Sequence, residues 1–161
     1  DRVVQVDRSL SQRRGRPSLP LLLKIAPDLV DEDVDQIADL ALDVGLDGII
    51  ATNTTLRHDL LSQAPNIAGG VSGRPLAPRA LDLTRRLYHR LEGRLPIIGV
   101  GGIHSADDAW DRIRAGATLL QVYTGFIYGG PGLIGAISRG LGDRISRSRY
   151  HSVSEVIGSG A

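Results

Sequence analysis

A pair of glycines between a short apolar run and a capped helix is the first feature of this sequence that could hold a ligand. Gly101 and Gly102 follow the β-branched run 97–100, and Ser105 stands three residues before Asp108. This order predicts a strand, a tight turn and a helix N-terminus. Because glycine has no Cβ, the backbone there can approach an anion, which the free amides at the start of the helix would hold. A compact turn without a ligand gives the same pattern, so this stretch alone leaves both interpretations open.

A run of small polar side chains, Thr52-Asn53-Thr54-Thr55, follows the second apolar stretch, 48–51. Ligands bind at the C-terminal ends of parallel strands in open sheets and barrels, and this run stands at such an end. The alternative is a turn rich in hydroxyl groups, without a ligand.

Lys24 interrupts the apolar run 19–26, which ends before Pro27 and predicts a buried strand. An ammonium group is costly to remove from water unless it finds a partner. Lys24 therefore either reaches solvent at the end of the strand or directs its charge at an anionic ligand or cofactor.

Four strand-helix units account for most of the chain and predict an α/β fold with a parallel sheet. We expect Asp31 to cap the first helix and Gly45 to end it. Pro78 should open the second helix, and Trp110 of the third helix should lie in the protein core. The fourth strand carries Tyr123 and Thr124 at its end. The predicted strands are 19–26, 48–51, 97–100 and 118–123, and the helices follow each of them. Every polar feature above then lies on one rim of a sheet or barrel, where barrels often bind phosphate after their last two strands.

Composition excludes several classes of protein. The net charge of +1 and the mixed charges give no basic face for nucleic acid. The chain has no cysteine, which rules out disulfides and thiolate metal sites, and the acidic cluster 31–35 suits a helix N-terminus better than a metal. No apolar run is long enough to cross a bilayer. The chain has no methionine and begins at Asp1, so we expect its natural N-terminus to lie upstream.

Five motifs in order resemble the second half of a dihydroorotate dehydrogenase of the quinone-linked, membrane-associated class. They are Lys-Ile-Ala-Pro-Asp-Leu at 24–29, Ile-Ala-Thr-Asn-Thr-Thr at 50–55, Gly-Gly-Val-Ser-Gly-Arg-Pro-Leu at 69–76, the stretch 96–102, and Gln-Val-Tyr-Thr-Gly-Phe at 121–126. The resemblance implies the second half of a (β/α)8 TIM barrel, with about four parallel strands. Residues 1–18 would be a polar lead-in or the cut end of an upstream element, 19–145 the C-terminal half of an FMN-binding barrel, and 146–161 a C-terminal tail.

This family oxidises dihydroorotate to orotate with FMN in pyrimidine (UMP) biosynthesis, and the quinone-linked class passes the electrons to a quinone. By resemblance, Asn53 and Thr54 would hydrogen-bond the substrate. The residues that would contact FMN are Lys24, Thr52, Gly73, Gly101, Gly102, Tyr123 and Thr124. Lys24 would stabilise the negative charge that the flavin gains on reduction.

The chain departs from the family in lacking any counterpart of the motif with the catalytic serine base, so we expect no catalytic residue in it. The N-terminal extension that would bind the quinone, and would attach the protein peripherally to the cytoplasmic side of the cell membrane, is also missing. A half barrel leaves edges unpaired, so we expect these residues alone to aggregate or self-associate without turnover. The alternatives are a soluble-class enzyme using fumarate or NAD, and a non-redox phosphate-binding α/β module.

Overall fold

The structure, a computed structural model, describes residues 2–63 and 68–161. Asp1 of the predicted lead-in and residues 64–67 of the long segment before the second helix lie outside the described residues. The strands are β1 (Leu22–Ile25), β2 (Gly48–Ala51), β3 (Ile97–Val100) and β4 (Leu119–Gln121). The helices are α1 (Arg2–Arg14), α2 (Asp31–Val44), α3 (Ala77–Leu91), α4 (Ala106–Arg114), α5 (Thr124–Gly129), α6 (Gly132–Ser146) and α7 (Val153–Val156), with short 3-10 turns at His58–Leu60 and Arg74–Leu76.

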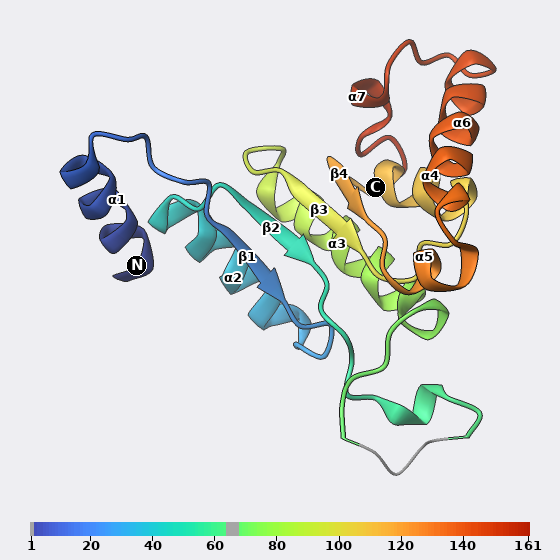
Figure 1. The fold of residues 1–161 in the computed structure, drawn as a ribbon, viewed down its shortest axis with the longest axis horizontal. Helices are drawn as coiled ribbons and strands as arrows, with labels where there is room; N and C mark the ends of the chain where they lie inside the picture. The colour runs from blue at the N-terminus through green and yellow to red at the C-terminus, as the bar shows by residue number, and fades with distance from the viewer. Residues whose placement is uncertain (1, 64–67) are drawn as a thin grey trace.

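The four strands form one parallel sheet in the order β1-β2-β3-β4, so each strand pairs with the next one in the sequence. Lys24 pairs with Ile50, and Val100 pairs with Gln121. Helices α2 and α3 lie behind the strands in Figure 1, because each connection between parallel strands crosses one face of the sheet. The predicted alternation is confirmed, and all four strands end at the same edge.

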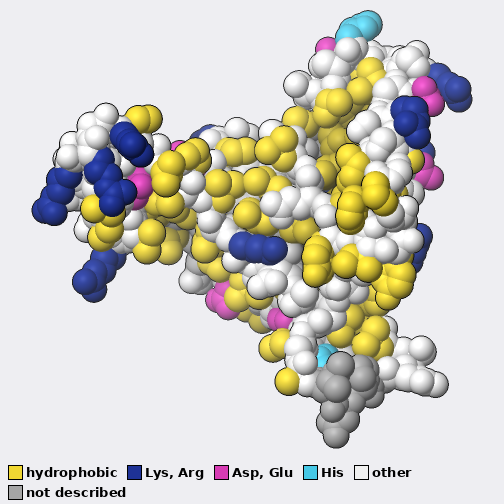
Figure 2. Space-filling view, viewed as in Figure 1, with side chains coloured by type: hydrophobic (Ala, Val, Ile, Leu, Met, Phe, Trp, Pro, Cys, Tyr) yellow, Lys and Arg dark blue, Asp and Glu magenta, His cyan; other side chains and the backbone are white. Residues whose placement is uncertain are grey.

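The main core lies between the sheet and helices α2 and α3. Ile49 of β2, Val34 of α2 and Leu87 of α3 are fully buried within it. The prediction that the run 19–26 is a buried strand is wrong for most of its length, since Leu22 and Leu23 of β1 are 38% and 37% exposed. Strands β1 and β4 are the two edges of the sheet and no described helix covers its front face, where hydrophobic side chains are visible (Figure 2).

A ladder of ion pairs joins α2 to α3. Asp31 accepts one hydrogen bond from Arg86 at 3.0 Å, and its other carboxylate oxygen lies 2.9 Å from Arg79. Arg86 also binds Asp35 at 2.7 Å, and one turn further along Arg90 binds Asp39. These arginines of α3 fix the two helices against each other.

The structure confirms two of the predicted helix ends and corrects a third. The Ser105 hydroxyl accepts a hydrogen bond from the Asp108 N–H at 3.1 Å, as the predicted cap requires, and Gly45 ends α2 with φ at 72°. Asp31 is not the cap of α2 but its first residue, because Val30 takes the extended cap position without a side-chain bond.

The C-terminal third of the chain departs further from the predicted pattern. Trp110 is only half-buried, with Tyr150 against its edge and Arg144 over its ring, so its expected place in the core is wrong. The short helix α5 begins at Thr124, directly after β4, and was not predicted. This helix matters for the site because it turns the chain sharply at the edge where the strands end.

Candidate functional site

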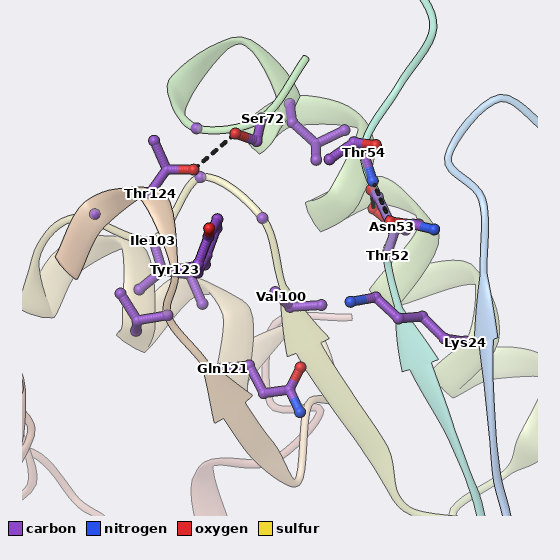
Figure 3. A pocket seen from close by; sticks show the side chains of 16 residues that line it. Lys24, Thr52, Asn53, Thr54, Ser72, Val100, Ile103, Gln121, Tyr123 and Thr124 are labelled. Atoms are coloured by element: carbon purple, nitrogen blue, oxygen red, sulfur yellow. Dashed lines mark hydrogen bonds between the residues drawn. The ribbon is translucent and has the colours of Figure 1, made fainter. Parts of the chain in front are cut away.

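A cavity of about 290 Å³ opens at the C-terminal ends of the strands. Every residue predicted to contact a cofactor or substrate lines it, although the roles of these residues stay predictions. The lining residues are Lys24, Thr52, Asn53, Thr54, Ser72, Gly73, Leu76, Val100, Gly101, Gly102, Ile103, Gln121, Val122, Tyr123, Thr124 and Gly125. Figure 3 shows their side chains around the cavity, with Lys24 and Thr124 on opposite sides.

Lys24 supplies the only charged side chain among the described residues that line this cavity. It stands near the end of β1, paired with Ile50 of β2, and its amino group extends over the strand ends toward the cavity (Figure 3). An exposed edge strand lets the long side chain reach this position without burying its charge. The Lys24 side chain is thus exposed to solvent and at the same time directed into the cavity.

The polar run after β2 is held by its backbone and by hydrogen bonds of its own side chains. The Thr52 hydroxyl donates to the Asn53 carbonyl at 2.9 Å, and the Asn53 Oδ1 accepts from the Thr54 N–H at 2.9 Å, which leaves the Asn53 side-chain NH2 group without a partner among the described residues. The N–H of Thr52 donates to the carbonyl of Val100 at 3.0 Å, and the N–H of Asn53 donates to the carbonyl of Ile25 at 2.8 Å. These bonds continue the sheet on both sides of β2, across a cis peptide between Ala51 and Thr52. Thr52 is buried, whereas Asn53 is exposed to the cavity.

Asp28 anchors the far end of the same run. Its carboxylate accepts hydrogen bonds from the hydroxyl of Thr55 and, at 2.9 Å, from the N–H of Leu56. A carboxylate that binds both a hydroxyl and an amide fixes the exit of the loop with charge-assisted bonds. The run is therefore tied to β1 and β3 at its start and to Asp28 at its end.

The turn after β3 requires its glycines. Gly101 and Gly102 have φ angles of 109° and 73°, which side chains rarely allow. A Cβ on Gly102 would also lie 2.6 Å from the Cα of Ala77 at the start of α3. Within the part of the chain that the structure describes, the N–H groups of both glycines are left without an acceptor. The turn thus offers free backbone donors in a position that only glycine fills well.

The opposite wall of the cavity comes from two loops that meet there. The hydroxyls of Ser72 and Thr124 are hydrogen-bonded at 2.8 Å, and a Cβ on Gly73 would lie 2.9 Å from the methyl carbon of Thr124. Sequence reasoning placed Gly73 and Thr124 here but assigned no role to Ser72 or Gln121. Both belong to the motifs 69–76 and 121–126, which is the signal that could have selected them.

Comparison with known proteins decides the family. The family model described as dihydroorotate dehydrogenase matches residues 3–145. The chain belongs to the dihydroorotate dehydrogenase family. It is 54% identical over 158 residues to the dihydroorotate dehydrogenase (quinone) of Thermobifida fusca, covering 95% of this chain and 42% of that protein. The dihydroorotate dehydrogenase (quinone) of Rhodococcus erythropolis is 52% identical over 148 residues, covering 88% of this chain and 41% of the relative.

Solved structures of dihydroorotate dehydrogenases share the fold. Ligand-free DHODH from Eimeria tenella superposes with a TM-score of 0.83 at 40% identity, over 88% of this chain and 40% of that one. The complex of the Eimeria tenella protein with ferulenol gives a TM-score of 0.82. The chain therefore has the fold of the second half of a dihydroorotate dehydrogenase TIM barrel, and it spans about two fifths of the length of the curated relatives it matches.

Two further properties of this member of the family concern membranes and metals. Among the described residues, no helix has the length and apolar character needed to cross a membrane. The same residues contain no group of three or more histidine or acidic side chains placed to hold a metal ion.

Proposed function

We propose that this chain is the second half of the barrel of a quinone-linked dihydroorotate dehydrogenase, which oxidises dihydroorotate to orotate in pyrimidine biosynthesis. One observation carries the proposal. A cation, a polar run and a glycine turn, drawn from the ends of different strands, line one cavity in a chain of this family.

The donors around the cavity fit FMN. Lys24 offers a positive charge on one side, while the free N–H groups of Gly101 and Gly102 suit a phosphate, as do the backbone amides of Tyr123 and Thr124. Bound FMN supplies the acceptor for the two electrons removed from dihydroorotate.

The buried Thr52 and the glycine at 73 would shape the walls against the cofactor. Gly73 lets the backbone approach closely, since a side chain there would press on Thr124. Lys24 would stabilise the negative charge that the cofactor ring gains on reduction. None of the described lining residues is acidic, so no carboxylate of the cavity wall neutralises the Lys24 charge.

Asn53 and Thr54 would bind dihydroorotate through its carboxylate and ring amides. The Asn53 N–H is bonded to Ile25 of β1, and the Thr54 N–H is bonded to the Asn53 side chain, so binding requires little reorganisation of the chain. The described cavity wall includes no carboxylate, imidazole or thiol that could remove the substrate proton. We assign the base, a serine by resemblance, to the first half of the barrel in the complete enzyme. The N-terminal extension of the complete enzyme would bind the quinone and attach the enzyme peripherally to the membrane.

The visible absorption spectrum of the complete enzyme tests this function. We expect a flavin spectrum that bleaches when dihydroorotate is added without oxygen and returns when a quinone is added. A flavin that bleaches but is reoxidised only by fumarate or NAD would place the enzyme in the soluble class. A colourless protein that binds phosphate esters would contradict the redox function and support a phosphate-binding module.

A further inference from the structure

Arg112 of α4 is the only charged side chain among the described residues that is almost completely buried, with 2% of its surface exposed. Its aliphatic stem passes over Gly99 in β3, where a Cβ would lie 2.6 Å from the Arg112 Cγ. The guanidinium group thereby reaches the end of the strand from the helix side of the sheet. Arg112 does not line the cavity, although the turn that it contacts does.

The guanidinium group binds two consecutive carbonyl groups at this turn. It donates to the Val100 oxygen at 3.2 Å and to the Gly101 oxygen at 2.8 Å. Successive carbonyls of an extended strand point in opposite directions, and the φ of 109° at Gly101 allows both to meet one cation. In a trans peptide the N–H points opposite to the carbonyl, so the N–H groups of Gly101 and Gly102 are directed away from Arg112. Consecutive N–H groups arranged in this way form an anion-binding concavity.

The charge of Arg112 has no counter-ion within the described residues. No carboxylate lies within ion-pair distance, and the Nε of Arg112 makes no hydrogen bond there. Asp108, the acidic residue that acts on it electrostatically, accepts a hydrogen bond from the His104 N–H. Burial lowers the pKa of Arg112 to about 10, opposed by Asp108, so the group remains charged at neutral pH. A buried cation without a counter-ion is costly, and an anion bound at the turn would offset that cost.

We propose that Arg112 is a positioning residue for the cofactor phosphate. It holds the Gly101 carbonyl and shares the Val100 carbonyl with the Thr52 N–H, which presents the Gly101 and Gly102 N–H groups to the phosphate, and it places a positive charge behind the turn. This inference rests on the proposed function, because it assumes that the ligand of the cavity carries a phosphate.

A comparison of FMN with riboflavin isolates the phosphate. The two ligands share the flavin ring and the sugar alcohol chain, so damage to the cavity as a whole weakens both. The complete enzyme is stripped of cofactor, and the dissociation constants of both ligands are measured by quenching of flavin fluorescence. In the wild type we expect FMN to bind much more tightly than riboflavin. In Arg112→Gln we expect FMN binding to weaken about tenfold or more, with riboflavin binding unchanged within about twofold.

Arg114→Gln is the matched control, since it removes the same charge from an exposed position on the same helix, and the preference for FMN should persist. Arg112→Lys keeps the cation but cannot bridge both carbonyls, so it should lose part of the preference. If Arg112→Gln does not fold, the preference of the Arg112→Lys variant for FMN over riboflavin tests the inference by itself.

A folded Arg112 variant that keeps the full preference for FMN, or that weakens both ligands equally, overturns this inference and leaves the proposed function standing. A wild type that binds no flavin overturns the proposed function, and the inference with it.

Discussion

The hydroxyl oxygens of Ser72 and Thr124 lie 2.8 Å apart and join two segments that are 52 positions apart in the sequence. This bond fixes the loop before α3 to the first residue of α5, on the wall of the cavity opposite Lys24. Ser72→Ala should therefore lower the free energy of unfolding by about 1 kcal/mol and weaken FMN binding several-fold. Urea denaturation and flavin titration of the complete enzyme would measure both effects.

Ser138→Ala is the control for the serine variant. The Ser138 hydroxyl donates to the Ile134 carbonyl on the exposed side of α6, away from the cavity. Its loss should leave FMN binding unchanged. Equal flavin affinity in the Ser72 variant and the wild type would show that the bond does not support the cofactor site.

Substitution of Lys24 should change the redox properties of the flavin more than its binding. In Lys24→Met the positive charge is lost, so the flavin midpoint potential should fall by about 30 mV or more, the value equivalent to tenfold in a two-electron equilibrium. Lys24→Arg keeps the charge and should retain most of the potential. Anaerobic titration with a reference dye measures the potential, and an unchanged value in the methionine variant would remove Lys24 from the flavin site.

Gly102→Ala should destabilise the protein and release FMN together. The left-handed backbone alone costs about 1–3 kcal/mol for a residue with a side chain, and the new Cβ would also press on the backbone of Ala77. Gly142→Ala in exposed helix α6 meets no atom within 4 Å and should stabilise the protein by about 0.5–1 kcal/mol. Thermal unfolding and flavin content distinguish the two, and a fully loaded Gly102→Ala enzyme would contradict the proposed turn.

Asn53→Ala should affect substrate binding without affecting the cofactor. We expect the KM for dihydroorotate to rise about tenfold, the loss of a single hydrogen bond to a charged group, with flavin content unchanged. Asn53→Asp adds a negative charge of similar shape and should be more severe, because it repels the substrate carboxylate. Steady-state kinetics measure the KM of both variants. An aspartate variant with a lower KM than the alanine variant would show that no carboxylate binds there.

The isolated chain of 161 residues should aggregate or self-associate, without turnover. Strands β1 and β4 leave two sheet edges unpaired among the described residues, and Leu22, Leu23 and Leu119 are exposed. Light scattering after size-exclusion chromatography, with an assay of dihydroorotate oxidation, measures both properties. A soluble, active monomer would contradict this expectation.

Local sequence signals predicted the parts of the fold that depend on neighbours in the chain. The β-branched runs of β2 and β3 and the Ser105 cap were predicted at their observed positions because glycine, proline and hydroxyl residues mark their ends. Helix α5 was missed because its six residues include two glycines and show no helical periodicity. Exposure of β1 was missed because an apolar composition does not reveal which strands will lie beside it.

The residues of the candidate site that lie in the sequence motifs could be predicted, whereas the buried position of Arg112 could not. In the sequence Arg112 is one of several charged residues of α4, next but one to the exposed Arg114. Its burial depends on Gly99, thirteen residues earlier on another element, whose missing side chain leaves room for the arginine stem. Contacts of this kind between a helix and a strand leave no periodic pattern for sequence analysis to detect.

The ion-pair ladder between α2 and α3 is more sensitive to a change in the length of α2 than to a substitution within it. Asp31, Asp35 and Asp39 recur every fourth residue, so they stand in one row facing the arginines of α3. One inserted residue would turn the rest of α2 by about 100° and carry every later carboxylate out of that row at once. Replacing Asp35 or Asp39 would remove one ion pair, and replacing Asp31 would remove its pairs with Arg79 and Arg86. Change in this part of the barrel is thus easier by substitution than by insertion or deletion.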